Sequence, residues 1–90
     1  MGQSTYKVPG GKMLKIQLSM SGEIIDKITI MGDFFLHPEE TVLILEDKLK
    51  GLKPDRDILI KTIQDVLEKN SALLIGAEAK DIAEAIIMAL

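Results

Sequence analysis

The sequence predicts an α+β fold in which an antiparallel β-hairpin or three-stranded sheet is covered on one face by about three helices. Apolar residues alternate with polar ones between residues 12 and 31, and helical periodicity recurs in three segments after residue 37. A sheet this small is marginally stable until a helical layer covers its apolar face. With a length of 90 residues, the chain is expected to form one domain over residues 1–90.

The strands of this fold are predicted before residue 32. Residues 1–5 are small and polar and are expected to be flexible, and Val8-Pro9-Gly10-Gly11 predicts a turn-rich loop. Strict alternation then predicts a half-buried strand, whose apolar residues are Leu14, Ile16, Leu18 and Met20. After the turn at 21–23, β-branched residues over 24–31 predict the second strand of a hairpin. The adjacent Ile24 and Ile25 indicate a bulge near its start.

Three helices are expected to follow. Phe34-Phe35-Leu36 predicts either a third short strand or an entry to the next element. His37-Pro38-Glu39-Glu40 indicates the start of a first helix, because proline suits the first helical position and carboxylates complement the helix dipole. Gly51 is expected to end that helix. Asp55 caps a second helix that reaches about Asn70, an apolar connector spans 71–76, and a third helix spans about 78–90.

Composition and charge argue against several classes of function. A net charge of −3 and a single arginine, Arg56, disfavour nucleic acid as the main partner. The absence of cysteine excludes disulfides, thiolate nucleophiles and cysteine metal sites. The N-terminus lacks the apolar region of a signal peptide, and no stretch approaches the roughly 20 apolar residues of a membrane span. We therefore expect a cytoplasmic protein that does not contact membranes.

Few side chains are available for catalysis, which needs a convergent set of groups. His37 is the only histidine, and beside Pro38 it is more often a helix cap or a buried polar contact than a functional residue. A lone histidine without nearby carboxylates also lacks a metal ligand set. Glu39 and Glu40 are most simply explained by the helix dipole. We therefore assign no catalytic residue and no metal site.

The glycine loop is one candidate binding segment. Lys7 and Lys12 flank Gly10-Gly11, and free backbone N–H groups in such a turn can bind an anion. It is not a Walker-type phosphate loop, because the glycines precede a strand and Met13 follows the lysine. The alternative is an ordinary turn with two solvated lysines.

The segment Gly32-Asp33-Phe34-Phe35 is a second candidate. Both phenylalanines of the chain are adjacent here, and in a strand they would point to opposite faces. An exposed phenylalanine beside a glycine fits an anchor for a protein partner. The alternative is that both phenylalanines are buried under the first helix.

Together, the runs Tyr6–Lys12 and Gly32–Glu40, separated by a hairpin, resemble the C-terminal accessory domain of lipoate–protein ligases. Leu49-Lys50-Gly51 and the segment Ile75–Ala83 also fit this family, so that the resemblance extends from about Ser4 to Leu90. In fold, that domain is also similar to the iron–sulfur scaffold group, a SufE/NifU-like arrangement. The cluster function does not carry over, because the cysteines of that group are missing here.

The resemblance implies an accessory subunit of an ATP-dependent lipoate–protein ligase. In that family a large catalytic part binds ATP, Mg2+ and lipoate and makes lipoyl-AMP. It then transfers the lipoyl group to a lysine of a lipoyl domain of 2-oxoacid dehydrogenases or of the glycine-cleavage H protein. The small domain assists the adenylation step, and in some prokaryotes it is a separate polypeptide. A 90-residue chain with its own Met1 matches that arrangement.

Alone, the chain is therefore expected to bind no cofactor and to be inactive, and to work as a heterodimer with the large catalytic subunit. The resemblance places two groups of residues at that subunit. Lys7, Gly10, Gly11 and Lys12 are expected to face the nucleotide or the catalytic subunit, and Asp33, Phe34, Phe35 and His37 to contact the partner. The alternative is a non-catalytic protein-interaction module, an iron–sulfur-scaffold relative without cluster ligands.

Overall fold

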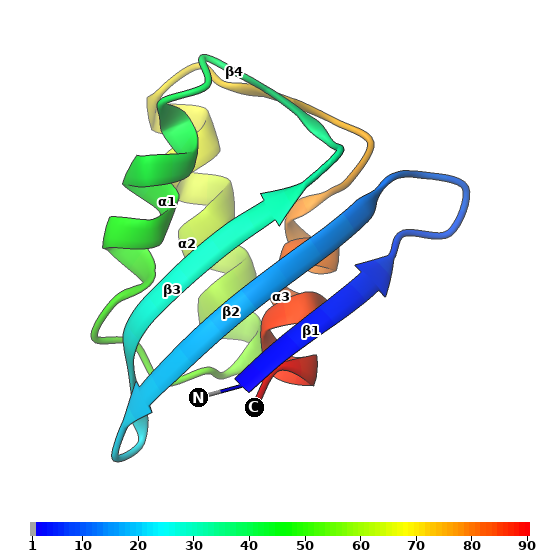
Figure 1. Cartoon of the computed structure of the whole chain (residues 1–90). Helices are drawn as coiled ribbons and strands as arrows, with labels where there is room; N and C mark the ends of the chain where they lie inside the picture. Colours follow the sequence, from blue (N-terminus) through cyan, green and yellow to red (C-terminus); the bar gives the residue numbers. More distant parts are fainter. Residues whose placement is uncertain (1) are drawn as a thin grey trace.

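Three antiparallel strands in the order β1-β2-β3 form the main sheet, and three helices lie against one of its faces (Figure 1). The computed structural model describes residues 2–90. In chain order the elements are β1 (Gly2–Lys7), β2 (Met13–Ser21), β3 (Ile24–Gly32), β4 (Phe35–His37), α1 (Thr41–Leu49), α2 (Arg56–Lys69), β5 (Leu73–Ile75) and α3 (Ala79–Met88). The predicted α+β class, with a three-stranded sheet covered on one face, is confirmed.

Apolar and polar residues alternate along the hairpin, so one face of the sheet is buried and the other is exposed, as the sequence predicts. Leu14, Ile16 and Leu18 of β2 are buried, whereas the residues between them are exposed. The predicted bulge is also present. Ser19 pairs with Lys27 and Met20 pairs with Ile25, so Asp26 is the extra residue near the start of β3.

Residues 2–5, which the sequence analysis expects to be flexible, are part of a strand in the structure, while Met1 lies outside the described residues. Gly2–Lys7 form β1, which pairs with β2 from Gly2↔Leu18 to Lys7↔Met13. The Ser4 hydroxyl donates a hydrogen bond to the Ala85 carbonyl of α3 at 2.6 Å. These small polar residues show no apolar alternation, because their order comes from strand pairing and from contact with α3.

A second, two-stranded sheet joins β4 to β5, with Phe35 opposite Ile75 and His37 opposite Leu73. The short strand predicted near Phe34–Leu36 therefore exists, but it does not join the main sheet. Its partner is the segment that the sequence analysis treated as a connector. Three apolar residues are too few to show a period, so this pairing was not predictable from the pattern.

The first helix begins later than predicted, at Thr41 instead of near Pro38. Glu39 and Glu40 therefore precede the helix, and its first turn contains no acidic residue. The prediction fails because β4 holds the chain extended through His37 and the Pro38 carbonyl then accepts the Thr41 amide, closing a turn.

The remaining helix boundaries agree with the sequence. Gly51 follows α1 with φ +84°, and its amide donates to the Ile25 carbonyl at 2.8 Å. Asp55 caps α2, its side chain accepting from the Asp57 amide, and Asn70 follows the last turn. Glu78 and Asp81 form a reciprocal capping box at the start of α3.

The core lies between the sheet and the helices and is aliphatic. Its largest fully buried apolar side chains are Leu14, Ile16, Leu18, Ile25, Leu45, Leu49, Leu59, Ile63, Ile82 and Ile86. Among residues 2–90 no helix is long and apolar enough to cross a membrane.

The contribution to stability of the Ser4–Ala85 hydrogen bond, which joins β1 to α3, can be tested by Ser4→Ala. We expect this change to lower the free energy of unfolding by about 1 kcal/mol, because the Ala85 carbonyl loses its donor. Chemical denaturation measures the effect, and Thr5→Ala, at the adjacent exposed position, is the control and should change the value by less than about 0.5 kcal/mol. Equal effects would show that β1 does not depend on this contact.

Candidate functional site

Three connections meet at one end of the molecule: the β1–β2 loop (8–12), the β3–β4 connection (33–34) and the segment between β5 and α3 (76–78) (Figure 1). We call this region the loop corner. The Lys12 amide donates to the Gly76 carbonyl at 3.0 Å. The Met13 amide donates to Asp33 Oδ1 at 2.7 Å, and the Asp33 amide donates to the Met13 carbonyl at 3.2 Å. The two candidate segments of the sequence are therefore held directly against one another.

Glycines make this close approach possible. Gly32 has φ +153°, and a Cβ at this position would lie 2.3 Å from the Met13 carbonyl oxygen. Gly76 has φ +95°, and a Cβ there would lie 2.5 Å from Cγ of Lys12. At both positions a side chain would be strained and would also push the connections apart. Gly76 belongs to a segment that fits the family, but no feature of the sequence indicates that it touches Lys12.

The glycine loop carries its charge on side chains. The Gly11 amide donates to the Val8 carbonyl at 2.8 Å, and the Lys12 amide is bound to Gly76. The expectation that these N–H groups are free for an anion is therefore wrong at Gly11 and Lys12, because the loop uses them to fix its own shape. Lys7 and Lys12 are exposed, and neither takes part in an ion pair within residues 2–90. Their ammonium groups remain as the positive charge of the loop.

The two phenylalanines have different environments. Phe34 is half-buried and packs against the core, whereas Phe35 is 52% exposed. The Phe35 ring stacks on His37, with centroids 6.3 Å apart and an interplanar angle of 5°. His37 is exposed, so it is neither a helix cap nor a buried contact as the sequence suggested. The Asp33 carboxylate accepts the hydrogen bond from the Met13 amide and so helps to hold the loop corner together.

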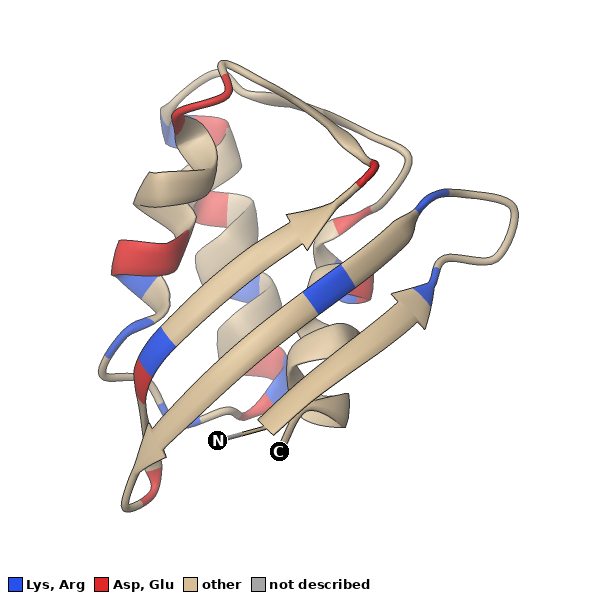
Figure 2. Ribbon diagram, in the orientation of Figure 1, with Lys and Arg blue, Asp and Glu red and all other residues tan. Residues whose placement is uncertain are grey.

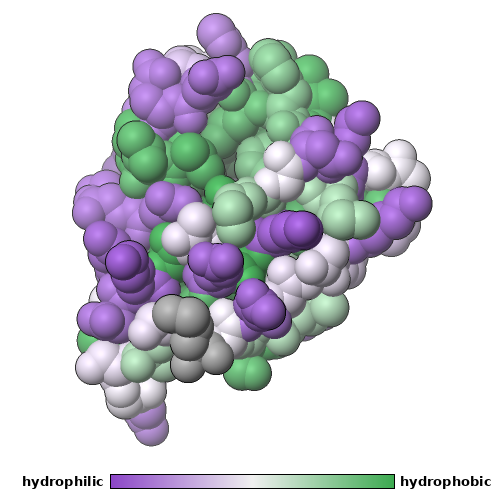
Figure 3. Space-filling model, in the orientation of Figure 1, coloured by the Kyte–Doolittle hydropathy of each residue, from purple (hydrophilic) through white to green (hydrophobic). Residues whose placement is uncertain are grey.

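Phe35 belongs to a larger apolar surface that sequence reasoning missed. Phe35 and His37 share one face of the β4–β5 ribbon with their cross-strand neighbours Ile75 and Leu73, which are 52% and 54% exposed. We call these four residues the ribbon face. Figure 3 shows hydrophobic residues gathered over the end of the molecule where β4 lies. The available signal was the apolar run Leu73–Ile75, which is unusual in a connector.

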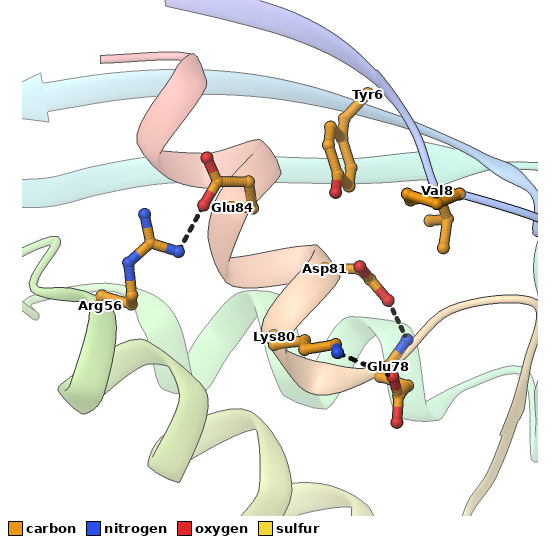
Figure 4. A pocket seen from close by; sticks show the side chains of 8 residues that line it. Tyr6, Val8, Arg56, Glu78, Lys80, Asp81 and Glu84 are labelled. Atoms are coloured by element: carbon orange, nitrogen blue, oxygen red, sulfur yellow. Dashed lines mark hydrogen bonds and ion pairs between the residues drawn. The ribbon is translucent and has the colours of Figure 1, made fainter.

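A cavity of about 370 Å³ lies beside the glycine loop (Figure 4). One wall is formed by Tyr6, Val8 and Pro9, at the N-terminal side of that loop, and the other wall is formed by residues of α2 and α3 and by Glu78. Four of the cavity's charged side chains form two ion pairs. Arg56 forms an ion pair with Glu84, and Lys80 Nζ lies 3.5 Å from Glu78 Oε2.

Asp81 lies on the same wall of this cavity and is engaged in the helix cap, its Oδ2 accepting the Glu78 amide at 2.8 Å. The cavity therefore presents no free nucleophile with an adjacent base. Residues 2–90 also contain no group of three His, Cys, Asp or Glu side chains arranged to hold a metal.

Comparisons with known proteins agree on one family. The model described as "Bacterial lipoate protein ligase C-terminus" matches residues 3–86. Lipoate-protein ligase A subunit 2 of Thermoplasma acidophilum is 30% identical over 89 residues, which cover 96% of this chain and 87% of that protein. A chain in the solved structure of a bi-partite lipoate protein ligase and its E2 lipoyl domain, from the same organism, superposes with a TM-score of 0.80. That match is 27% identical and covers 93% of this chain and 91% of the other.

Proposed function

This chain belongs to the family of lipoate protein ligase C-terminal domains, and we propose that it assists a separate catalytic subunit in activating lipoate to lipoyl-AMP. The observation that carries the proposal is the similarity, over nearly the full length of both chains, to subunit 2 of a bipartite ligase. In this proposal ATP, Mg2+ and lipoate are held by the catalytic subunit. The lipoyl group then passes to a lysine of a lipoyl domain.

An assisting role also fits the chemistry available in this chain. Joining a carboxylate to the α-phosphate of ATP brings negatively charged groups together, so the step benefits from positive charge, positioning and exclusion of water. The paired charges in the cavity of Figure 4 offer no convergent catalytic set. The chain's proposed contribution is therefore electrostatic and conformational, made when it closes over the catalytic subunit.

The loop corner is the part of the chain suited to that contribution. Hydrogen bonds to Gly76 and Asp33 fix both the end of the glycine loop and the start of β2. Lys7 and Lys12 therefore project from a rigid base, and a preorganised charge stabilises an anionic transition state at little cost in reorganisation. We propose that these two ammonium groups face the triphosphate or the substrate carboxylate in the assembled ligase.

The ribbon face is the proposed contact with the catalytic subunit. Phe35, Leu73 and Ile75 expose large apolar side chains side by side on one ribbon. Stable interfaces have an apolar centre in which aromatic residues are enriched, and burial of such side chains supplies most of the binding free energy. Because β4 follows the loop corner directly, docking through this face would also place the corner at the partner.

The ribbon face is equally compatible with a second function, a protein-interaction module that stabilises its partner without affecting the chemistry. Lipoate-dependent ATP–pyrophosphate exchange distinguishes the two. We expect this chain to raise the exchange rate of the catalytic subunit at least about tenfold, because it supplies positioning and charge. An exchange rate that does not depend on this chain would contradict the accessory role and leave the interaction module.

Lys7→Ala and Lys12→Ala test the charge of the glycine loop. We expect the double variant to slow lipoyl-AMP formation by about tenfold in the assembled complex, because positive charge near the triphosphate is lost. Transfer from supplied lipoyl-AMP to a lipoyl domain should stay unchanged, as it needs no triphosphate. Lys61→Ala on α2 is the control, since it removes an exposed lysine from the helical layer. Normal adenylation in the double variant would rule out the charge role.

Phe35→Ala and Ile75→Ala test the ribbon face. Each change should raise the Kd for the catalytic subunit about tenfold, because an apolar anchor is lost from the centre of the interface. Calorimetry or surface binding of the purified subunits measures the effect. Met88→Ala is the matched control, because Met88 is also about half exposed but lies at the C-terminal end of α3, away from β4 (Figure 1). If the control weakens binding as much as the ribbon variants, the interface lies elsewhere.

A further inference from the structure

The main sheet has one face that no element covers, and the two carboxylates of its hairpin lie together at one end of the sheet. Its outward side chains alternate with inward ones along the strands, and most of them are exposed. We call it the open sheet face and define it by Gln3, Thr5, Lys15, Gln17, Lys27 and Met31. Figure 3, which views the molecule from this side, shows hydrophilic and near-neutral residues over most of the strands.

The charge of this face is opposite to that of the whole chain. Residues 2–32 contain four lysines and two carboxylates, whereas residues 33–90 contain seven basic and twelve acidic residues. Figure 2 shows the lysines along the strands and beside the β1–β2 loop. The two carboxylates lie at the far end of the sheet, Glu23 in the hairpin turn and Asp26 in the bulge. Glu23 is moreover 3.8 Å from Lys53 Nζ.

Lys15 and Lys27 have no acidic partner among residues 2–90. A hollow of about 490 Å³ lies on this face, and Thr5, Lys15 and Met31 are among the residues that line it. The strands run about 30 Å along this face, because a nine-residue strand advances about 3.3 Å per residue. A surface of this length, with separated charges and few apolar groups, fits an acidic protein surface better than a small ligand.

The open sheet face and the ribbon face suit different kinds of contact. Apolar interfaces are typical of permanent subunit association, whereas charged and polar ones speed encounter and favour release. In the proposed function this chain forms a heterodimer with the catalytic subunit, whereas the acceptor domain must arrive and leave in every turnover. The apolar ribbon is thus suited to the subunit, and the basic sheet to the acceptor.

We propose that the open sheet face receives an acidic surface of the protein domain that is lipoylated. This inference rests on the proposed function. It also has a geometric basis, because the face runs without interruption into the loop corner through the pair Lys7↔Met13. An acceptor whose lysine reaches an active centre beside the loop corner would have the rest of its surface alongside the strands.

The test uses the purified complex of this chain with its catalytic subunit and a lipoate-free lipoyl domain at varied concentration. Lys15→Glu combined with Lys27→Glu should raise the KM for the lipoyl domain at least about fivefold, with pyrophosphate exchange unchanged. Lys15→Gln combined with Lys27→Gln should raise it less, because charge is removed without being reversed. The matched control reverses two exposed lysines of α2, Lys61→Glu and Lys69→Glu, and should leave the KM as it is.

Salt supplies a second readout. The KM of the wild-type complex should rise between low and moderate ionic strength, and that of the Lys15→Glu/Lys27→Glu complex should rise less. An unchanged KM in the charge-reversed complex overturns the proposal. Failure of that complex to assemble also overturns it, since the face would then belong to the subunit interface. Pyrophosphate exchange that is independent of this chain in the wild-type complex would instead contradict the proposed function.

Discussion

Burial of one apolar sheet face beneath three helices is the constraint on which the rest of this structure depends. Leu14, Ile16 and Ile86 are fully buried where sheet and helices meet, and the core contains no tryptophan and neither phenylalanine. An aliphatic core of this size needs every inward side chain of the hairpin, because a small domain buries only about 60% of its unfolded surface. The helices occupy one side, and the opposite side of the sheet is left uncovered.

The same layering explains how the loop corner is held. The start of β2 lies beside the end of β3 in the antiparallel sheet, so the pairing of these strands brings their flanking connections into contact. The Met13–Asp33 and Lys12–Gly76 hydrogen bonds then lock three connections that are far apart in the sequence. A loop fixed in this way presents lysine side chains in a defined place, which a mobile loop would not do.

The chain therefore combines three surfaces with different chemistry on one small scaffold. The loop corner carries positive charge, the ribbon face exposes apolar side chains, and the open sheet face is basic and polar. This combination suits a subunit that acts on another protein's active centre, where charge, attachment and substrate access must be arranged together. These surfaces also explain how a member of the lipoate protein ligase family can contribute to the reaction although it has no convergent set of catalytic groups.

The sequence by itself determined the α+β class, the hairpin with its bulge, and the limits of α2 and α3. Those features depend on local periodicity and caps, which neighbouring residues carry. It also identified two of the three connections of the loop corner, the β1–β2 loop and the segment that follows β3. Only the tertiary structure decided that Gly2–Lys7 is a strand, that β4 pairs with β5, and that the Gly11 and Lys12 amides are already bonded. These outcomes arise from pairing between residues distant in sequence, and short polar or apolar segments carry no period that would reveal it.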